Sequence, residues 1–144
     1  MLDGRELKMQ NTSWDPDTVA WQEIAKDGSK YALLEGVRGQ DGDPFTYAFS
    51  IPAGFWDPPH RHTQTARVFV AKGTLYLGYG NIEDESLLQA FPAGSLVIVP
   101  AHAVHFDGSH EDAVIFGCAV GPWRTIYVHP TYQGSAGTPG QPLA

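Results

Sequence analysis

The chain has 144 residues, a net charge of −7 and an apolar share of 42%, which together predict one globular domain. The negative charge and the lack of a Lys/Arg cluster argue against nucleic acid and anionic membrane as partners. The single cysteine, Cys118, excludes an intramolecular disulfide, and its small and apolar neighbours predict a buried, inert thiol.

The N-terminal residues are polar and mixed in composition. Residues 1–17 are predicted to form an arm, which Trp14 orders against the body or against a partner. Met1–Asp15 contains no apolar stretch suited to a signal peptide, and no apolar run reaches the roughly 18 residues of a membrane span. These features predict a soluble, cytoplasmic protein.

From Thr18 the chain is a succession of short runs with turn signals between them. Phe45–Ile51 alternates apolar residues on one face, which is the period of a β-strand. Ser95–Val99 and Ala113–Val120 are continuous apolar runs, which predict buried strands. Further strands are expected at Thr18–Ile24, Lys30–Glu35, Arg67–Lys72, Thr74–Tyr79 and Trp123–Val128.

The spacing of these runs predicts the fold class. Apolar residues nowhere repeat at helical spacing over more than about two turns. Short strands at regular spacing therefore predict an all-β sandwich or barrel with little or no helix, over residues 18–130. Gly, Pro, Ser and Thr dominate after His129, so residues 131–144 are predicted to be a tail.

Two of the six histidines stand one residue apart, directly after a double proline. In an extended segment, positions i and i+2 point the same way, so His60 and His62 present two imidazoles to one side. Pro58 and Pro59 favour that extended geometry. Divalent ions of Zn, Fe, Mn, Ni or Cu accept such pairs, but two imidazoles alone make a weak site. The second compact segment offers a third candidate, His105.

The two histidine segments resemble the two sequence motifs of the cupin superfamily. The first motif runs from Gly54 through five residues to His60-Arg61-His62 and on to Gly73; the second runs from Gly94 through five residues to Pro100 and then His105. The resemblance covers roughly Phe45 to Val120. It implies a small single-domain cupin, a double-stranded β-helix (jelly-roll barrel) that holds the histidines near its open end. It also implies that His60, His62 and His105 bind the metal.

This sequence departs from the cupin pattern at two places. Cupins usually carry a glutamate four or five residues after the second histidine, where this chain has Ala66 and Arg67. His102 stands where the second motif usually has glycine. Three neutral imidazoles without a carboxylate leave a divalent ion with its full charge and an open position. Such a site favours an anionic partner, namely a carboxylate, an enolate or hydroxide.

Other polar residues near the motifs are candidates for supporting roles. Gln64 shares the strand parity of the two histidines, so it could add a weak amide ligand or orient a water. His102 is expected at the rim, where it could shuttle protons. Arg67 either holds a substrate anion or faces solvent. Asp57 and Asp107 are expected to be solvated loop carboxylates, or else acceptors for imidazole N–H groups.

These residues leave three functions open. The first is a metal-dependent enzyme, with a dioxygenase as the leading reaction, that acts on a small oxygen-rich or anionic molecule through Fe, Mn, Zn or Ni. In that reading His102 or Gln64 handles protons or water. The second is an isomerase or lyase that uses the metal only as a Lewis acid. The third is a small-molecule binding module without catalysis. The resemblance also implies a homodimer, joined through residues 1–24 or an open sheet edge.

Overall fold

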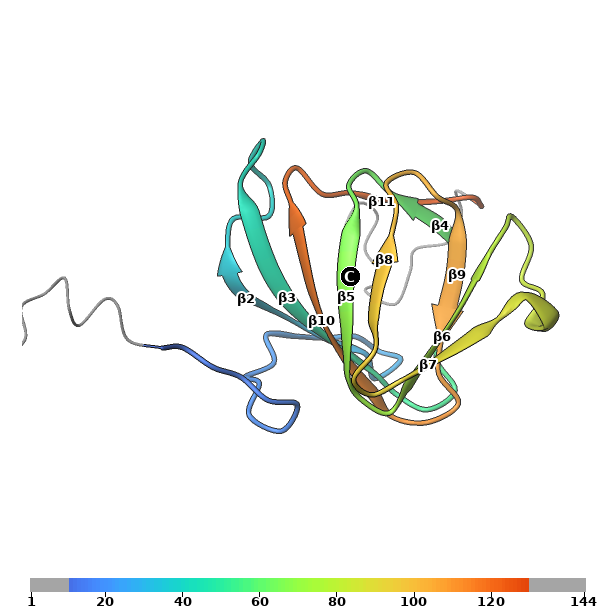
Figure 1. Cartoon of the computed structure of the whole chain (residues 1–144), viewed down its shortest axis with the longest axis horizontal. Helices are drawn as coiled ribbons and strands as arrows, with labels where there is room; N and C mark the ends of the chain where they lie inside the picture. The colour runs from blue at the N-terminus through green and yellow to red at the C-terminus, as the bar shows by residue number, and fades with distance from the viewer. Residues whose placement is uncertain (1–10, 130–144) are drawn as a thin grey trace, which may run out of the picture.

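The computed structural model describes residues 11–129, which form two antiparallel β-sheets facing each other (Figure 1). One sheet has the strand order β1-β2-β3-β10-β5-β8 and the other has the order β11-β4-β9-β6-β7. The elements are β1 (Glu23–Ile24), β2 (Lys30–Gly36), β3 (Pro44–Ile51), β4 (Trp56–His62), β5 (Ala66–Lys72), β6 (Thr74–Tyr79), the 3-10 helix η1 (Glu85–Leu87), β7 (Gln89–Pro92), β8 (Leu96–Val99), β9 (His105–Gly108), β10 (Ala113–Val120) and β11 (Thr125–Tyr127). This architecture confirms the predicted all-β double-stranded β-helix.

The core lies between the two sheets and follows from the alternation of residues along the strands. In β3 the inward side chains are Phe45, Tyr47, Phe49 and Ile51, and all of them are buried, as their period of two predicts. The rings of Phe45 and Tyr47 pack against Trp123, whose buried indole comes from the segment between β10 and β11. The aromatic core therefore continues up to the residues that precede β11.

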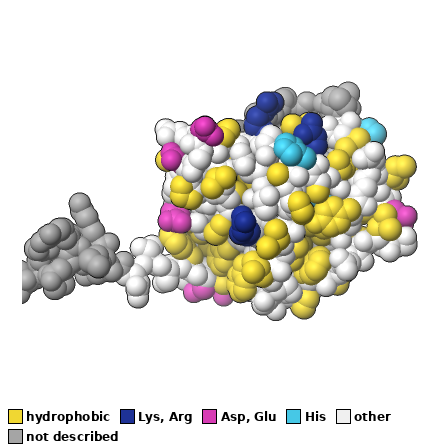
Figure 2. Space-filling model, turned by 45° about the horizontal axis from the view of Figure 1, so that its top comes forward, with side chains coloured by type: hydrophobic (Ala, Val, Ile, Leu, Met, Phe, Trp, Pro, Cys, Tyr) yellow, Lys and Arg dark blue, Asp and Glu magenta, His cyan; other side chains and the backbone are white. Residues whose placement is uncertain are grey.

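The outer face of the larger sheet is only partly covered. Val19 from the N-terminal segment is buried in a cluster on its β2–β3–β10 part, and Trp21 packs against that cluster. Further along the same sheet, Leu96 and Ile98 of the edge strand β8 are 68% and 53% exposed, and Phe69 of β5 is 44% exposed. Figure 2 shows hydrophobic side chains gathered on this face.

Two predictions about burial were wrong, and one strand was not predicted. Ser95–Val99 was expected to be a buried strand, but β8 alternates between exposed and buried residues because it forms a sheet edge. Cys118 is exposed, since it points outward from β10. Strand β7, over Gln89–Pro92, has no clear periodic signal, and its pairing with β6 is what holds it extended.

A register shift in β4 determines which residues face the interior. Asp57 pairs with Asp107 of β9, and His60 pairs with His105, with an irregularity between Asp57 and His60. An extra residue of this kind is a β-bulge, which reverses side-chain parity on one strand only. Side chains three positions apart, at Asp57 and His60, consequently both contribute to one polar cluster.

The predicted terminal segments lie largely outside the described residues. Of the predicted arm, residues 1–17, only residues 11–17 are described, and Trp14 among them is exposed. The predicted tail, residues 131–144, lies wholly outside the described part, as does the last residue of the predicted domain 18–130. The extents of arm and tail therefore stay predictions.

Gly73, which joins β5 to β6, should tolerate a side chain far less well than Gly54. Both glycines have left-handed φ angles, of 71° and 85°. A Cβ at Gly73 would lie 2.3 Å from the Asp112 carbonyl oxygen, whereas a Cβ at Gly54 meets nothing within 4 Å. We expect Gly73→Ala to lower the free energy of unfolding by about 2–4 kcal/mol and Gly54→Ala by about 1 kcal/mol. Urea denaturation measures both, and equal losses would contradict the steric explanation.

Candidate metal centre

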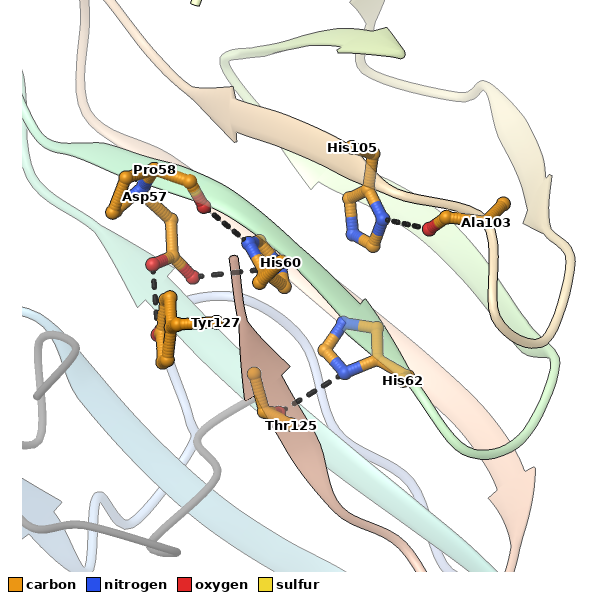
Figure 3. A network of polar contacts seen from close by, with 8 residues as sticks. All are labelled: Asp57, Pro58, His60, His62, Ala103, His105, Thr125 and Tyr127. Carbon is orange, nitrogen blue, oxygen red and sulfur yellow. Dashed lines mark hydrogen bonds and ion pairs between the residues drawn. The ribbon is translucent and has the colours of Figure 1, made fainter. Parts of the chain in front are cut away.

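The three predicted ligand histidines come together on neighbouring strands of the smaller sheet. His60 and His62 lie on β4, and His105 lies directly opposite His60 on β9. Their relative exposures are 1%, 6% and 2%. One ring nitrogen of each lies within 4.8 Å of the others (Figure 3). This confirms that the two motifs meet in space, and that His60 and His62 point to the same side.

Each of the three imidazoles is oriented by a contact at its Nδ1 atom (Figure 3). The Nδ1 of His60 lies 2.6 Å from the Pro58 carbonyl oxygen, and that of His105 lies 2.9 Å from the Ala103 carbonyl oxygen. The Nδ1 of His62 lies 3.0 Å from Oγ1 of Thr125. A carbonyl only accepts, so His60 and His105 donate from Nδ1 and keep the Nε2 lone pair for a metal. The residues present therefore fit a divalent transition ion.

Burial keeps the three imidazoles neutral, which is the form that binds metals. Burial, together with the positive charge that His60 would carry, lowers the pKa of His105 to about 3. The pKa of His60 is also lowered by burial. The pKa of His62 is lowered well below its usual value by burial, by the two neighbouring imidazoles and by the charge of Arg38. An incoming ion therefore competes with few protons at neutral pH.

Aromatic side chains surround the histidines. The indole of Trp123 stacks on His62, with ring centroids 4.4 Å apart and planes 26° apart. The ring of Tyr127 lies 5.4 Å from that of His60, and the ring of Tyr79 lies 6.3 Å from that of His105. These rings pack around three imidazoles that are at most 6% exposed, so they help to shield the imidazoles from water.

Ala66, one of the two positions where cupins usually carry the glutamate, faces the barrel interior. Ala66 is buried on the inward face of β5, so no carboxylate reaches the histidines from this strand. Arg67 is exposed on the opposite face of β5, next to Ile98 in the sheet register. Of the two roles considered for Arg67, the structure supports the one in which it faces solvent.

Two carboxylates lie beside His60, so of the two environments considered for them, the solvated loop was wrong. Asp57 and Asp107 lie on strands, not in solvated loops, and burial raises the pKa of each to about 7. The Tyr127 hydroxyl donates a 2.8 Å hydrogen bond to Asp57, which lowers that pKa in part. Asp57 Oδ2 lies 3.7 Å from Nε2 of His60. Strand periodicity alone does not predict this arrangement, because the bulge in β4 creates it.

Gln64 and His102 lie in the turns that follow β4 and β8. Gln64 is half-buried and its amide donates a 3.3 Å hydrogen bond to the Pro122 carbonyl oxygen. His102 is exposed, has a φ of 68°, and its Nδ1 lies 3.4 Å from a guanidinium nitrogen of Arg61. Its backbone N–H donates to the carbonyl of His62, which ties this turn to the ligand strand. Their proposed catalytic roles stay predictions.

Sequence patterns did not reveal the contribution of β11. Thr125 lies opposite His62 and Tyr127 lies opposite His60 in the β4–β11 register. Both contacts depend on a strand pairing between residues more than sixty positions apart. The one available signal was the short β-prone run at Trp123–Val128, which predicted a strand but not its neighbour.

Comparison with known families agrees with this geometry. Residues 9–124 match the family model described as the ChrR cupin-like domain. The chain belongs to this family of cupins. Its sequence matches no protein with a curated description.

Solved structures with the same fold include proteins of different activities. DMSP lyase DddQ from Ruegeria pomeroyi has a TM-score of 0.61 and 16% identity, over 81% of this chain and 64% of that one. A variant of salicylate 1,2-dioxygenase from Pseudoaminobacter salicylatoxidans has a TM-score of 0.57 and 11% identity, over 72% of this chain and 31% of that one. KdgF from Halomonas sp. has a TM-score of 0.58 and 13% identity, over 77% of this chain and 94% of that one. At these identities the likeness shows the fold.

Among residues 11–129, no helix has the length and apolar composition that a membrane crossing requires. The cytoplasmic location stays a prediction.

The low pKa of His105 should appear in the pH dependence of stability. Its pKa is about 3 when folded and about 6.5 when unfolded, so the unfolded chain binds more protons below pH 6.5. The stabilisation is complete above pH 6.5 and is lost as the pH falls. We expect the unfolding free energy of the metal-free protein, relative to His105→Gln, to fall by about 1.3 kcal/mol per pH unit between pH 5.5 and 4, and less steeply between pH 6.5 and 5.5.

The comparison with the variant isolates His105, because the raised pKa values of Asp57 and Asp107 act in the opposite direction in both proteins. Urea denaturation with a chelator present, at several pH values, measures the difference. Parallel curves for the two proteins would contradict the assigned pKa.

Proposed function

We propose that this protein is a metal-dependent enzyme that acts on a small, oxygen-rich or anionic organic molecule, with dioxygenation as the leading reaction. The observation that carries the proposal is the convergence of His60, His62 and His105, buried and each oriented by a contact at Nδ1. A bound divalent transition ion supplies Lewis acidity toward substrate oxygens and, where the metal is redox-active, the capacity to react with dioxygen.

The charge of this site supports an anionic substrate. The three imidazoles are neutral, and Ala66 removes the carboxylate that usually offsets the charge of the ion. An anionic group of the substrate can take that place and compensate the remaining charge. A binding preference for carboxylates or enolates over neutral analogues follows from this balance.

Arg38 and Trp123 support the same substrate class. The guanidinium of Arg38 lies over the ring of Tyr31, 4.6 Å from its centroid. Its positive charge contributes to the lowered pKa of His62. Its loop is joined to the turn before Trp123 by two backbone hydrogen bonds between Gly121 and the loop, of 2.8 and 2.9 Å. The indole N–H of Trp123 is buried without a hydrogen-bond partner among the described residues. Buried donors are rarely left unpaired, so a substrate oxygen is a suitable acceptor.

A lyase or isomerase that uses the metal only as a Lewis acid is the second candidate. Its support is the shared fold with DMSP lyase DddQ and the proximity of Asp57 and Tyr127 to His60, which places proton-carrying groups beside the ligands. A binding module without catalysis is the third candidate, since the fold hosts both kinds of protein. Metal identity and oxygen uptake separate the first two.

The test is metal content and oxygen uptake, measured on the same preparations. We expect wild-type protein to bind one divalent ion per chain, and His105→Ala to bind it at least about a hundredfold more weakly, because a direct ligand is lost. The Fe(II)-loaded protein should consume oxygen with a diketone or a catechol-like acid, and the Zn(II)-loaded protein should not.

His110→Ala is the matched control, since His110 is exposed and packs on Trp56 and Tyr76. Equal metal binding by wild type and His105→Ala would refute the metal site. Oxygen uptake absent across the substrate panel, with metal bound, would favour the lyase or the binding module.

We also propose that the protein forms a homodimer through the outer face of β5 and β8. The edge strand β8 carries no charged residue and presents Leu96 and Ile98 to solvent, beside Phe69 and the exposed Arg67 of β5. An apolar, unprotected sheet edge invites pairing with another strand, and a second copy of β8 offers the same surface in return. The described part of the N-terminal segment covers only the β2–β3–β10 side of this sheet.

A charge within this apolar face should separate the two copies. We expect wild-type protein to elute as a dimer and Ile98→Glu to elute as a monomer, because the carboxylate would be buried against the partner. The matched control is Ile82→Glu, since Ile82 is 77% exposed and lies away from β5 and β8. Light scattering coupled to size exclusion measures the mass. Equal masses for wild type and Ile98→Glu would refute this interface.

A further inference from the structure

Asp57, His60 and Asp107 form a second group of potential ligands beside the three histidines. One ligand atom of each lies within 4.8 Å of the others, and His60 belongs to both groups. Figure 3 shows Asp57 on one side of the His60 ring, with His62 and His105 on the other. The bulge in β4 brings about this arrangement, because it places Asp57 opposite Asp107 while His60 stays opposite His105.

The protein groups described around this cluster leave it incompletely paired. Asp57 and Asp107 are direct cross-strand partners, a pairing that is unfavourable for two like charges. Asp57 accepts a hydrogen bond from Tyr127, but Oδ1 of Asp107 is buried without a hydrogen-bond partner among the described residues. The ring of His60, only 1% exposed, directs its Nε2 toward Asp57. A buried carboxylate oxygen left unpaired in this way needs a partner, which a cation or an ordered water can supply.

The spacing of these atoms suits a single cation. Two ligand atoms about 2.1 Å from one ion, at angles between right and tetrahedral, lie roughly 3.0–3.4 Å apart. Nε2 of His60 and Oδ2 of Asp57 lie 3.7 Å apart, so a shift of a few tenths of an ångström brings both atoms to the spacing of two ligands on one ion. Two carboxylates also match the charge of a divalent ion, which the three-histidine position does not.

We propose that Asp57, His60 and Asp107 form an oxygen-rich position for a divalent cation, alternative to the three-histidine position and sharing His60 with it. The inference rests on the proposed metal site only in that shared ligand. The nitrogen of His60 binds one ion at a time, so the chain holds an ion at one position or at the other. Harder ions such as Mn²⁺ favour carboxylate oxygens, and Ni²⁺ favours imidazoles. The identity of the metal therefore selects the side of His60 on which it binds.

A crossed experiment separates the two positions. Mn²⁺ and Ni²⁺ are each titrated alone into wild type, Asp107→Asn, His62→Gln and His60→Gln, and binding is followed by equilibrium dialysis with metal analysis. We expect Asp107→Asn to weaken Mn²⁺ binding at least about tenfold and Ni²⁺ binding less than about threefold. His62→Gln should show the reverse, and His60→Gln should weaken both.

Asp107 is the residue to change, because replacing Asp57 would also remove the partner of Tyr127. Asp17→Asn is the matched control, since Asp17 is 84% exposed and its loss changes the net charge equally. Circular dichroism of the metal-free variants establishes that they fold. In wild type, Ni²⁺ should displace Mn²⁺ with one ion bound in total, a measurement that needs no variant.

The outcomes distinguish this inference from the proposed function. If Asp107→Asn changes neither ion or weakens both equally, or if His62→Gln abolishes Mn²⁺ binding, the oxygen-rich position is wrong and the three-histidine site stands. If two ions bind wild type together, the sharing of His60 is wrong. If His62→Gln leaves Ni²⁺ binding unchanged while Asp107→Asn weakens Mn²⁺ binding, the oxygen-rich position stands and the three-histidine site fails.

Discussion

The site depends on the burial of three neutral imidazoles at the meeting point of β4 and β9. Burial lowers the pKa of each ring, so the free nitrogen is available without competition from protons at neutral pH. The contacts at Nδ1 then fix the direction of that nitrogen. Two of these contacts are to carbonyls two residues earlier in the chain, so the orientation of His60 and His105 is largely a local property of the backbone.

The carboxylates nearest the histidines do not come from the strand where cupins usually carry their glutamate. A motif glutamate would approach the histidines from β5, where Ala66 now lies buried. The carboxylates of this chain approach instead from β4 and β9, at Asp57 and Asp107. A divalent ion at the three-histidine position would therefore keep its charge uncompensated by β5, which is why the proposed substrate is anionic. The proposed oxygen-rich position has a separate origin, the bulge in β4.

The errors of the sequence predictions have a common physical origin. Cys118 and the run Ser95–Val99 were assigned to the interior on their own hydrophobicity, yet a strand at a sheet edge, or an outward position in a strand, exposes apolar residues. Asp57 was assigned to a solvated loop because period-two reasoning does not foresee a bulge. The arrangement of Thr125 and Tyr127 could not be foreseen, because nothing local specifies the neighbour of β11.

The sequence by itself determined the all-β class and the placing of His60 and His62 on one side, and its resemblance to the cupin motifs pointed to the barrel and to His105 as their companion. These features depend on short-range periodicity and on motif spacing, which are written in the order of residues. The tertiary structure alone decided that Arg67 faces solvent, that β11 supports the histidines, and that Asp57 and Asp107 meet beside His60. Those outcomes depend on strand order and register, which arise only when segments distant in sequence pair.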